Sequence, residues 1–377
     1  MRPGHGCTID IPDGTDDLLE GGFNIVFEIT FDDGVKWVAR VRKQSFKSPP
    51  GEIRSMIHQS EVESMKILYS ATGLVPLIHV PPEEDIKSDG ELEYFFLDFV
   101  QGESLHPPIL NGEETPERLK NIIHDYALFQ IKIKSKPFDL LGSICPPSRG
   151  STSPTVGPLL HMTLRSDHPP YFIGPFKSNK ERYLSQIDFV LGMIEKRVIY
   201  PQDPSLIYLF HLDLKDMINR YDKWEDDEEE RFYFKHADDK GDHIFTDEDG
   251  HITGVIDWEW TYVTSKAEAF SSPLAMIPPS SFWDGDNTLS SLEEMLIVEY
   301  ENLGHPDLAK CVREGKIYQR LNLLLGYYPD LKHLNALREL ITNDEVSFFD
   351  EREYQEWCVD RFGEDSGYLK LCGHDDK

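Results

Sequence analysis

Residues 232–260 read FYFKHADDKGDHIFTDEDGHITGVIDWEW. Three short β-rich runs and one turn are predicted inside this segment: 232–235, 243–246, 252–256 and the turn 247–250. An Asp-Gly pair between two apolar runs is typical of a β-hairpin. The pattern therefore predicts a polar loop and a hairpin that bring two carboxylates, Asp238 and Asp257, to one end of a small sheet.

Two carboxylates placed in this way suit phosphoryl transfer, a reaction that needs mainly positioning and electrostatic stabilisation from the protein. One carboxylate orients the attacking hydroxyl and accepts its proton. The other holds the magnesium ions that neutralise the nucleotide phosphates. Acidic turns of an ordinary surface hairpin explain either aspartate alone equally well, so the hypothesis depends on the whole constellation.

Two motifs in this segment resemble those of a known superfamily. His236-Ala237-Asp238 resembles the H-G-D or H-R-D catalytic loop of kinase-like proteins. Ile256-Asp257-Trp258-Glu259 is similar to the I-D-W-E that replaces D-F-G in aminoglycoside phosphotransferase-like proteins, especially fungal ones. The resemblance covers about residues 18–275. It implies an α+β, protein kinase-like fold of two lobes, with the nucleotide between them.

A second H-x-D sequence lies upstream, at His211-Leu212-Asp213. Apolar residues recur at helical spacing through 206–218, and Asp203 with Pro204 is a typical helix start. No hairpin with a second aspartate follows at a suitable distance. We therefore interpret His211 and Asp213 as ordinary polar positions on a helix and not as the catalytic loop.

Glycines precede the first long predicted strand. Strands are expected over 25–31 and 36–42, and Gly21-Gly22-Phe23-Asn24 stands just before them. Glycine allows backbone N–H groups to approach phosphates closely, although an ordinary turn explains the pair as well. The four residues are similar to the nucleotide loop of the fungal family, so the resemblance implies that Gly21, Gly22, Phe23 and Asn24 cover the phosphates.

Arg40 marks a departure from the kinase pattern. Val38-Ala39-Arg40-Val41 stands where kinases have V-A-I-K, so arginine replaces the lysine that contacts the phosphates. Arginine keeps the charge and can grip phosphate with two N–H groups, but its shape and reach differ. A helix is predicted over 59–68, and its Glu61 matches the family glutamate that pairs with the strand cation. Without the resemblance, both residues would be ordinary surface charges.

The resemblance also implies a hinge and two lobes. A strand is predicted over 92–100, and backbone groups of Asp98, Phe99 and Val100 would hydrogen-bond adenine there. We place the lobe boundary near Gly102. The expected divisions are a loose arm over 1–16, a β-rich N-lobe over 17–101, and a larger, mainly helical C-lobe over 102–377.

The end of the catalytic loop is a second departure. The family has a magnesium-binding asparagine there, but the count from His236 puts His243 at that position. Imidazole suits manganese better than magnesium, which prefers oxygen ligands. Asp242 could supply the carboxylate if the loop is shifted by one residue. Alternatively, Asp257 binds the ion and His243 joins only for a softer metal, or His243 simply begins the strand.

Bulk properties narrow the possible partners. A formal net charge of −30 and a pI near 4.8 argue against nucleic acid or an anionic membrane, and they are compatible with a cationic small-molecule substrate. The five cysteines are widely spaced and show no metal-binding pattern. No signal sequence or run of transmembrane length is present, so we expect a soluble, cytoplasmic protein.

We therefore expect ATP-dependent transfer of a phosphoryl group to a hydroxyl of a small molecule, with Mg²⁺, or alternatively Mn²⁺, as the metal. Asp238 orients the hydroxyl, His236 braces the loop, Asp257 binds the metal, and Glu259 shapes the substrate side. The missing A-P-E sequence argues against a protein kinase. The alternative is a non-catalytic, kinase-shaped protein that binds a nucleotide or other ligand. The acceptor, the choice between ATP and GTP, and the oligomeric state remain open.

Overall fold

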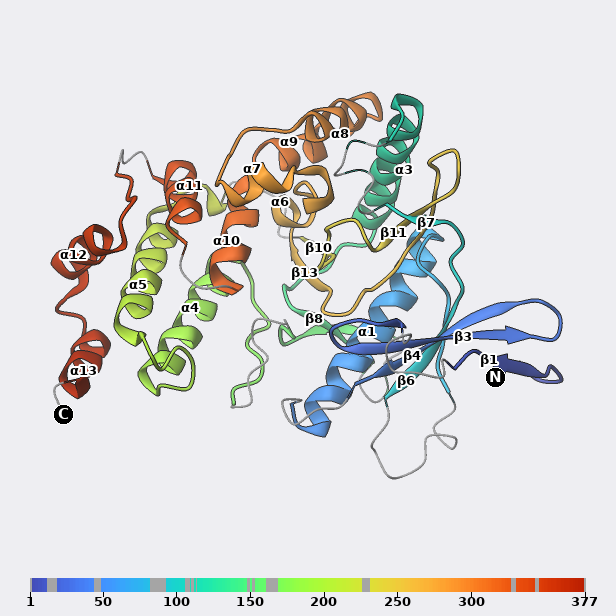
Figure 1. The fold of residues 1–377 in the computed structure, drawn as a ribbon, viewed down its shortest axis with the longest axis horizontal. Coiled ribbons are helices and arrows are strands. Elements are labelled where there is room, and N and C mark those ends of the chain that lie inside the picture. Colours follow the sequence, from blue (N-terminus) through green and yellow to red (C-terminus); the bar gives the residue numbers. More distant parts are fainter. Residues whose placement is uncertain are drawn as a thin grey trace. The chain divides into compact units, whose positions relative to one another are not determined.

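The computed structural model describes residues 2–11, 19–43, 49–81, 93–105, 109, 112, 114–147, 150, 153–160, 169–225, 231–326, 330–342 and 346–375 (Figure 1). The chain forms two compact units. One comprises Met1–Lys136, Ser143–Tyr171 and His236–Tyr262, and the other comprises Pro137–Gly142, Phe172–Lys235 and Val263–Lys377. The predicted catalytic segment thus belongs to the same unit as the N-terminal strands. The lobe boundary near Gly102 stays a prediction.

An antiparallel sheet with the strand order β1-β3-β4-β6-β5 forms the centre of the first unit, and β2 also pairs with β3. Its strands are β1 (Cys7–Ile9), β2 (Leu19–Glu20), β3 (Asn24–Phe31), β4 (Lys36–Arg42), β5 (Ile78–His79) and β6 (Tyr94–Asp98). The strands predicted over 25–31 and 36–42 are confirmed. The one predicted over 92–100 is shorter, and its residue 92 lies outside the described residues.

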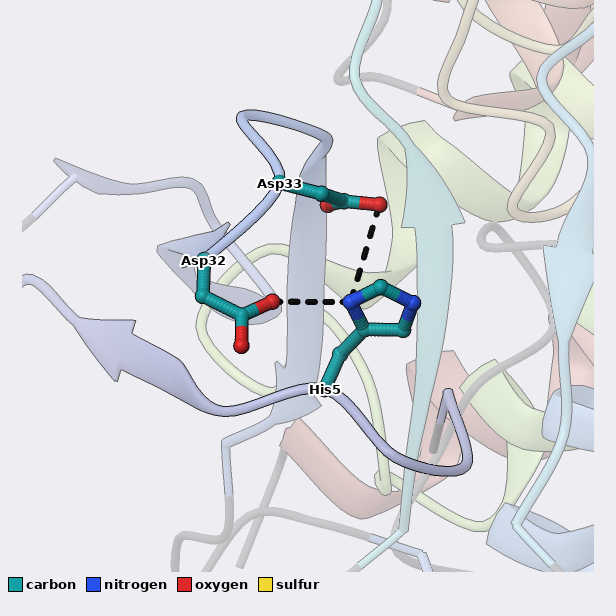
Figure 2. Close-up of side chains that lie close together, drawn as sticks. All are labelled: His5, Asp32 and Asp33. Carbon is teal, nitrogen blue, oxygen red and sulfur yellow. Dashed lines mark hydrogen bonds and ion pairs between the residues drawn. The ribbon is translucent and has the colours of Figure 1, made fainter.

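Strand β1 corrects the expectation of a loose arm over 1–16. Cys7–Ile9 pairs with the end of β3, and residues 12–16 lie outside the described part of the chain. Figure 2 shows how His5 is attached: its Nδ1 atom lies 2.8 Å from an Asp32 carboxylate oxygen. In addition, an Arg2 N–H donates to Asp33 over 2.7 Å. Both aspartates belong to the turn between β3 and β4.

Alternation along β4 separates its apolar residues from its charges. Successive side chains of a strand point to opposite faces. Trp37 and Ala39 are therefore buried on one face, while Arg40 and Arg42 share the other. The register pairs Asn24 of β3 with Arg42, which places the Asn24 side chain on the arginine face as well.

Helix α1 (Gly51–Thr72) supplies a buried carboxylate to this unit. It is longer than the predicted range of 59–68, and it ends at Gly73, whose φ of 69° is easily adopted by glycine. Its buried stripe consists of Ile57, Val62, Met65 and Leu68. Glu61 is also buried, with a relative exposure of 4%.

The predicted hairpin is confirmed. Strands β11 (Ile244–Thr246) and β12 (Ile252–Val255) pair in antiparallel fashion, and β7 (Glu103–Ser104) joins β11 on its other edge.

Helix α3 (Pro116–Lys134) begins at Thr115, whose hydroxyl caps it by accepting from the Arg118 N–H. A further antiparallel pair consists of β8 (Ser143–Cys145) and β9 (Thr155–Gly157).

The β-rich run predicted over 232–235 is confirmed as strand β10 (Phe232–Lys235). It pairs with β13 (Tyr262–Ser265) and not with the hairpin. The sequence alone did not indicate this partner, because strand pairing is decided by contacts that sequence proximity does not reveal.

The second unit is mainly helical. Its helices are α4 (Asn179–Glu195), α5 (Pro204–Arg220), α6 (Lys266–Ala269), α7 (Pro279–Trp283), α8 (Ser291–Asn302), α9 (Pro306–Arg313), α10 (Lys316–Gly326), α11 (Leu331–Ile341), α12 (Glu351–Phe362) and α13 (Ser366–Asp375). Helix α5 is largely buried and packs against α4, α11, α12 and α13 (Figure 1). Within the described residues, no helix has both the length and the apolar composition needed to cross a membrane.

The rejected H-x-D sequence lies on α5, as predicted, but its polar residues belong to the core. His211 and Asp213 have relative exposures of 2% and 0%. The His211 Nδ1 atom lies 2.8 Å from the Ile207 carbonyl oxygen. Asp213 accepts from the Arg338 guanidinium and, over 3.1 Å, from the Tyr354 hydroxyl. These contacts join α5 to α11 and α12, so the role of both residues is structural.

We predict that Asp213→Ala destabilises the second unit by about 3–5 kcal/mol, because it leaves the Arg338 cation buried without its partner. Asp216→Ala is the matched control on the same helix, since Asp216 pairs with the partly exposed Arg220 and Arg361. We expect the control to cost at most about 1 kcal/mol. Chemical denaturation followed by tryptophan fluorescence measures both losses, and losses of equal size would contradict the prediction.

Acid should weaken this unit through His211. Burial lowers the pKa of His211 from 6.5 to about 4, so the folded protein keeps the ring neutral while the unfolded chain takes up a proton below pH 6.5. Stability is therefore lost as the pH falls from 6.5 towards 4. We expect His211→Gln to lose about 2 kcal/mol less than the parent between pH 7 and pH 5. Identical pH dependence of the free energy of unfolding would show that His211 is not responsible.

Candidate active site

His236 holds the predicted catalytic loop in place. Its Nε2 atom lies 3.0 Å from the Ile256 carbonyl oxygen, and its Nδ1 atom accepts from the Asp238 N–H over 3.2 Å. The ring also packs edge-on against Trp258 at 4.8 Å. Burial, together with the neighbouring His243, lowers the pKa of His236 well below its usual value, so the ring is neutral and donates from Nε2. This geometry supports the bracing role and not a role as general base.

Asp238 is the carboxylate that His236 positions, and its side chain is 50% exposed. Lys240 Nζ lies 2.5 Å from Asp238 Oδ2 and 2.9 Å from Asp242 Oδ2. Lys240 was missed in the sequence, although a cation two residues after the candidate base is a signal that could have found it. It places a positive charge where a negatively charged phosphoryl group would approach Asp238.

Asp257 lies two residues after the end of β12 and has a left-handed backbone, with φ of 59°. An Nη2 N–H of Arg40 donates to its Oδ1 over 2.6 Å. Burial alone would raise the pKa of Asp257, but the charge and hydrogen bond of Arg40, together with the nearby His236 and His243, outweigh that effect and keep the pKa below its usual value. Asp257 is therefore an ionised carboxylate at the end of the hairpin, as a metal ligand must be.

Arg40 and Glu61 form the predicted pair between strand and helix. Arg40 Nε lies 3.5 Å from Glu61 Oε1, but the two atoms are not aligned for a hydrogen bond. Burial raises the pKa of Glu61, with Arg40 opposing that shift. The nearby carboxylates of Glu61, Asp257 and Glu259 in turn outweigh the effect of burial on Arg40 and raise its pKa. Arg40 thus remains a cation surrounded by three acidic side chains.

Glu259 is bonded to residues of β3 and β4, and its expected role on the substrate side stays a prediction. Its carboxylate is buried and accepts from Asn24 Nδ2 over 2.5 Å, from Arg40 Nη2 over 2.9 Å and from Arg42 Nη1. Arg42 was also missed in the sequence. Its position two residues after Arg40, and hence on the same face of β4, could have indicated it.

The glycines of the nucleotide loop are not required by the packing of the protein itself. Gly21 and Gly22 are exposed and have ordinary φ values, and a Cβ atom at either position would meet nothing within 4 Å. The Gly21 N–H donates to the Asn24 carbonyl over 2.9 Å, and the Phe23 ring lies 5.5 Å from that of Trp260. The open space at the glycines is compatible with the close approach of a ligand.

The predicted hinge residues are mostly engaged in the sheet. The Asp98 N–H donates to the Leu77 carbonyl and the Phe99 N–H to the Lys36 carbonyl. Within the described residues, the Val100 N–H donates to no protein acceptor. Of the three expected adenine contacts, Val100 therefore offers the free donor.

The structure does not gather the three predicted metal ligands. Asp242 pairs with Lys240, and the His243 ring is buried and stacks on His236 at 4.0 Å. Among the described residues His243 Nδ1 has no hydrogen-bond partner, and it lies 3.9 Å from Asp242 Oδ1. Asp257 has the oxygen chemistry that magnesium prefers, whereas ligand roles for Asp242 and His243 stay predictions.

Among the described residues, the one group of three whose potential ligand atoms all lie within 4.8 Å of one another is His5, Asp32 and Asp33 (Figure 2). This group is exposed, and the Arg2 cation already donates a hydrogen bond to its Asp33. It attaches β1 to the β3–β4 turn, and nothing in it points to a bound metal.

Helix α3 fixes the turn of the hairpin that carries Asp257. The Arg118 guanidinium donates to the carbonyls of Asp247 and Glu248, and Asn121 donates to that of Asp249. Asp125 accepts from the Ile252 N–H over 3.0 Å. These bonds attach the turn to a long helix of the same unit and so limit the movement of β12.

Comparisons with known proteins complete this description. No family model matches the chain. No curated protein matches it by sequence. Three solved structures resemble it in fold. A thermostable mutant of aminoglycoside phosphotransferase APH(4)-Ia is 16% identical, with a TM-score of 0.45, 93% of this chain covered and 96% of the other. An ethanolamine kinase from Plasmodium vivax is 15% identical, with a TM-score of 0.48 and coverages of 96% and 85%. Macrolide 2'-phosphotransferase type I is 15% identical, with a TM-score of 0.45 and coverages of 94% and 90%.

These three proteins are of the class that the sequence motifs resemble.

The hairpin turn offers a test of how α3 positions the site. Gly250 has φ of 86°, and a Cβ atom there would lie 2.8 Å from the Arg118 carbonyl oxygen. Gly34 has φ of 83° but open space around it, so Gly34→Ala is a matched control for the backbone strain. We expect Gly250→Ala to lower the free energy of unfolding by about 1–3 kcal/mol more than Gly34→Ala does. Equal losses in chemical denaturation would show that the close approach to α3 is unimportant.

Proposed function

We propose that this chain is an ATP-dependent phosphotransferase that acts on a hydroxyl group of a small molecule. One observation carries the proposal. His236, which positions the candidate base Asp238, is hydrogen-bonded to the carbonyl of Ile256, the residue directly before the candidate metal ligand Asp257. The two carboxylates that phosphoryl transfer needs are therefore fixed relative to each other within one unit.

The residues around these carboxylates fit a nucleotide. Gly21 and Gly22 leave open space, Arg40 supplies a cation beside Asp257, and Val100 offers a backbone N–H to adenine. Magnesium, when bound, neutralises charge on the phosphates, and Asp257 would hold it, with Asp242 or His243 as candidate second ligands. Arg40 pairs with Asp257, so phosphate oxygens and a metal ion would replace a contact that already exists.

Asp238 performs the proton transfer in this proposal. As the substrate hydroxyl attacks the terminal phosphorus of ATP, its proton passes to the Asp238 carboxylate, and ADP leaves. Lys240, which pairs with Asp238, keeps a positive charge next to the group being transferred. The half-exposed position of Asp238 leaves it accessible to a substrate.

Two features define the substrates to test. The sequence lacks the A-P-E segment of protein kinases, which favours a small-molecule acceptor. A net charge of −30 is compatible with cationic acceptors. Aminoglycosides, ethanolamine and macrolides, which appear in the names of the structural neighbours, form a reasonable first panel.

The alternative is a nucleotide-binding protein without catalytic activity. The observation that favours it is His243, whose ring is buried against His236 at the position where the family has a metal-binding asparagine. An assay with manganese helps to distinguish an active phosphotransferase from a non-catalytic protein, because the His243 imidazole would bind manganese better than magnesium. Assays should therefore include both metals, and GTP should be compared with ATP.

We predict that Asp238→Asn lowers the rate of phosphoryl transfer at least about 100-fold and leaves the Kd for ATP nearly unchanged, because a general base acts mainly in the transition state. Asp249→Asn is the matched control, since the Asp249 side chain lies exposed in the hairpin turn. Transfer to the acceptor panel and calorimetric titration with ATP measure the two effects. An Asp238→Asn variant with full activity would refute the assignment of the base. Failure of the parent protein to bind ATP with either metal would refute the proposed function.

A further inference from the structure

We infer that Glu259 is a positioning residue that fastens the nucleotide loop, residues 21–24, to the turn Asp257–Trp260. The inference rests on the proposed function, because it assigns the loop to the nucleotide. Glu259 itself would not touch the nucleotide or the acceptor. Its role is to hold the loop and the metal ligand Asp257 in a fixed relation.

The contacts of Glu259 use both carboxylate oxygens. Oε2 accepts from Asn24 over 2.5 Å and from Arg40 over 2.9 Å, while Oε1 accepts from Arg42. Asn24 is the last residue of the nucleotide loop and the first of β3. A single side chain from the turn thus holds the end of the loop and both arginines of β4.

A second contact fastens the same two segments. The Phe23 ring packs edge-on against Trp260 at 5.5 Å, and the Arg42 guanidinium lies 5.5 Å from the Trp260 ring. Phe23 and Asn24 are neighbours in the loop, and Glu259 and Trp260 are neighbours in the turn. The Phe23–Trp260 contact is apolar and the Asn24–Glu259 contact is polar. Together they fix both the distance between the loop and the turn and the orientation of one relative to the other.

The backbone of the turn supports a functional role. Asp257 and Trp260 both have a left-handed conformation, with φ of 59° and 64°, which is sterically unfavourable for residues other than glycine. Such strain persists only where surrounding contacts hold it, and it is concentrated at functional sites. Here the strained turn directs Asp257 to Arg40 and Glu259 to the loop.

Stability alone does not explain the arrangement. A buried ion pair contributes little net stability, because desolvation of the charges offsets their attraction. This site buries Arg40 and Arg42 among the carboxylates of Glu61, Asp257 and Glu259. What such a cluster provides is a defined geometry, and the element whose geometry it defines is the nucleotide loop.

The test compares Glu259→Gln with the parent protein by hydrogen exchange without nucleotide. The Gly21 N–H donates to the Asn24 carbonyl, so its exchange reports on the loop directly. We expect residues 21–24 to exchange about tenfold faster in the variant, because a charged hydrogen bond to Asn24 is weakened. Glu28→Gln is the control. Glu28 lies elsewhere on β3 and pairs with the partly exposed Lys36 of β4. Its substitution should therefore leave the hydrogen exchange rates of residues 21–24 unchanged.

Kinetics provide the second readout. For Glu259→Gln we expect the KM for ATP to rise about tenfold while kcat changes less than about threefold, since Glu259 acts on binding through the loop. Asn24→Ala removes the same contact and leaves the buried charges intact. It should show the same increase in exchange and in KM, and it decides the question if Glu259→Gln does not fold.

The outcomes separate this inference from the proposed function. Unchanged exchange of residues 21–24 in the folded variants would overturn the inference, and so would faster exchange with an unchanged KM. A parent protein that binds no ATP, but whose loop exchanges faster in both variants, would overturn the proposed function and leave the fastening of the loop by Glu259 established.

Discussion

The candidate site depends on the backbone of Ile256. Its carbonyl oxygen lies within hydrogen-bonding distance of His236 Nε2, and its N–H donates to the His243 carbonyl over 2.8 Å. Both ends of the loop 236–243 are therefore attached to the residue that precedes Asp257. Hydrogen bonds shielded from water are stronger than exposed ones, and here they also define distances. Without these two hydrogen bonds of Ile256, Asp238 and Asp257 would move independently, however well each was placed on its own.

Charge balance is the second constraint on the first unit. Strand β4 contributes two cations to one face of the sheet, and the helix α1 and the turn Asp257–Trp260 contribute the carboxylates that neutralise them. The sequence resemblance puts Arg40 where kinases have lysine. Its several N–H groups allow it to contact Asp257 and Glu259 at once, which the single ammonium group of lysine does less well. The choice of arginine is thus matched by the carboxylates around it.

Local patterns in the sequence predicted the hairpin, the long strands and the helices, because period and turn residues determine them. The pairing of Arg40 with Glu61 came from the family resemblance and not from these local patterns. Local patterns alone indicated only two ordinary surface charges. The local patterns could not predict that Glu259 binds Asn24 and Arg42, since these partners lie more than 200 residues away in the chain. A motif gives the place of a residue in the chain but not the direction of its side chain. For the same reason, the burial of His211 and Asp213 was missed, because the partners of Asp213 come from α11 and α12.

The attachment of β1 has a consequence for how copies of this chain meet. All three side chains of β1 are exposed, so little apolar burial holds it, and the ion pairs of Arg2 and His5 with the β3–β4 turn are open to solvent. Salt screens such pairs. High ionic strength, or removal of the first eleven residues, would therefore free the end of β3 that β1 covers, residues 29–31. An open strand edge is a template for pairing with another chain, so a short and weakly held strand guards this protein against aggregation.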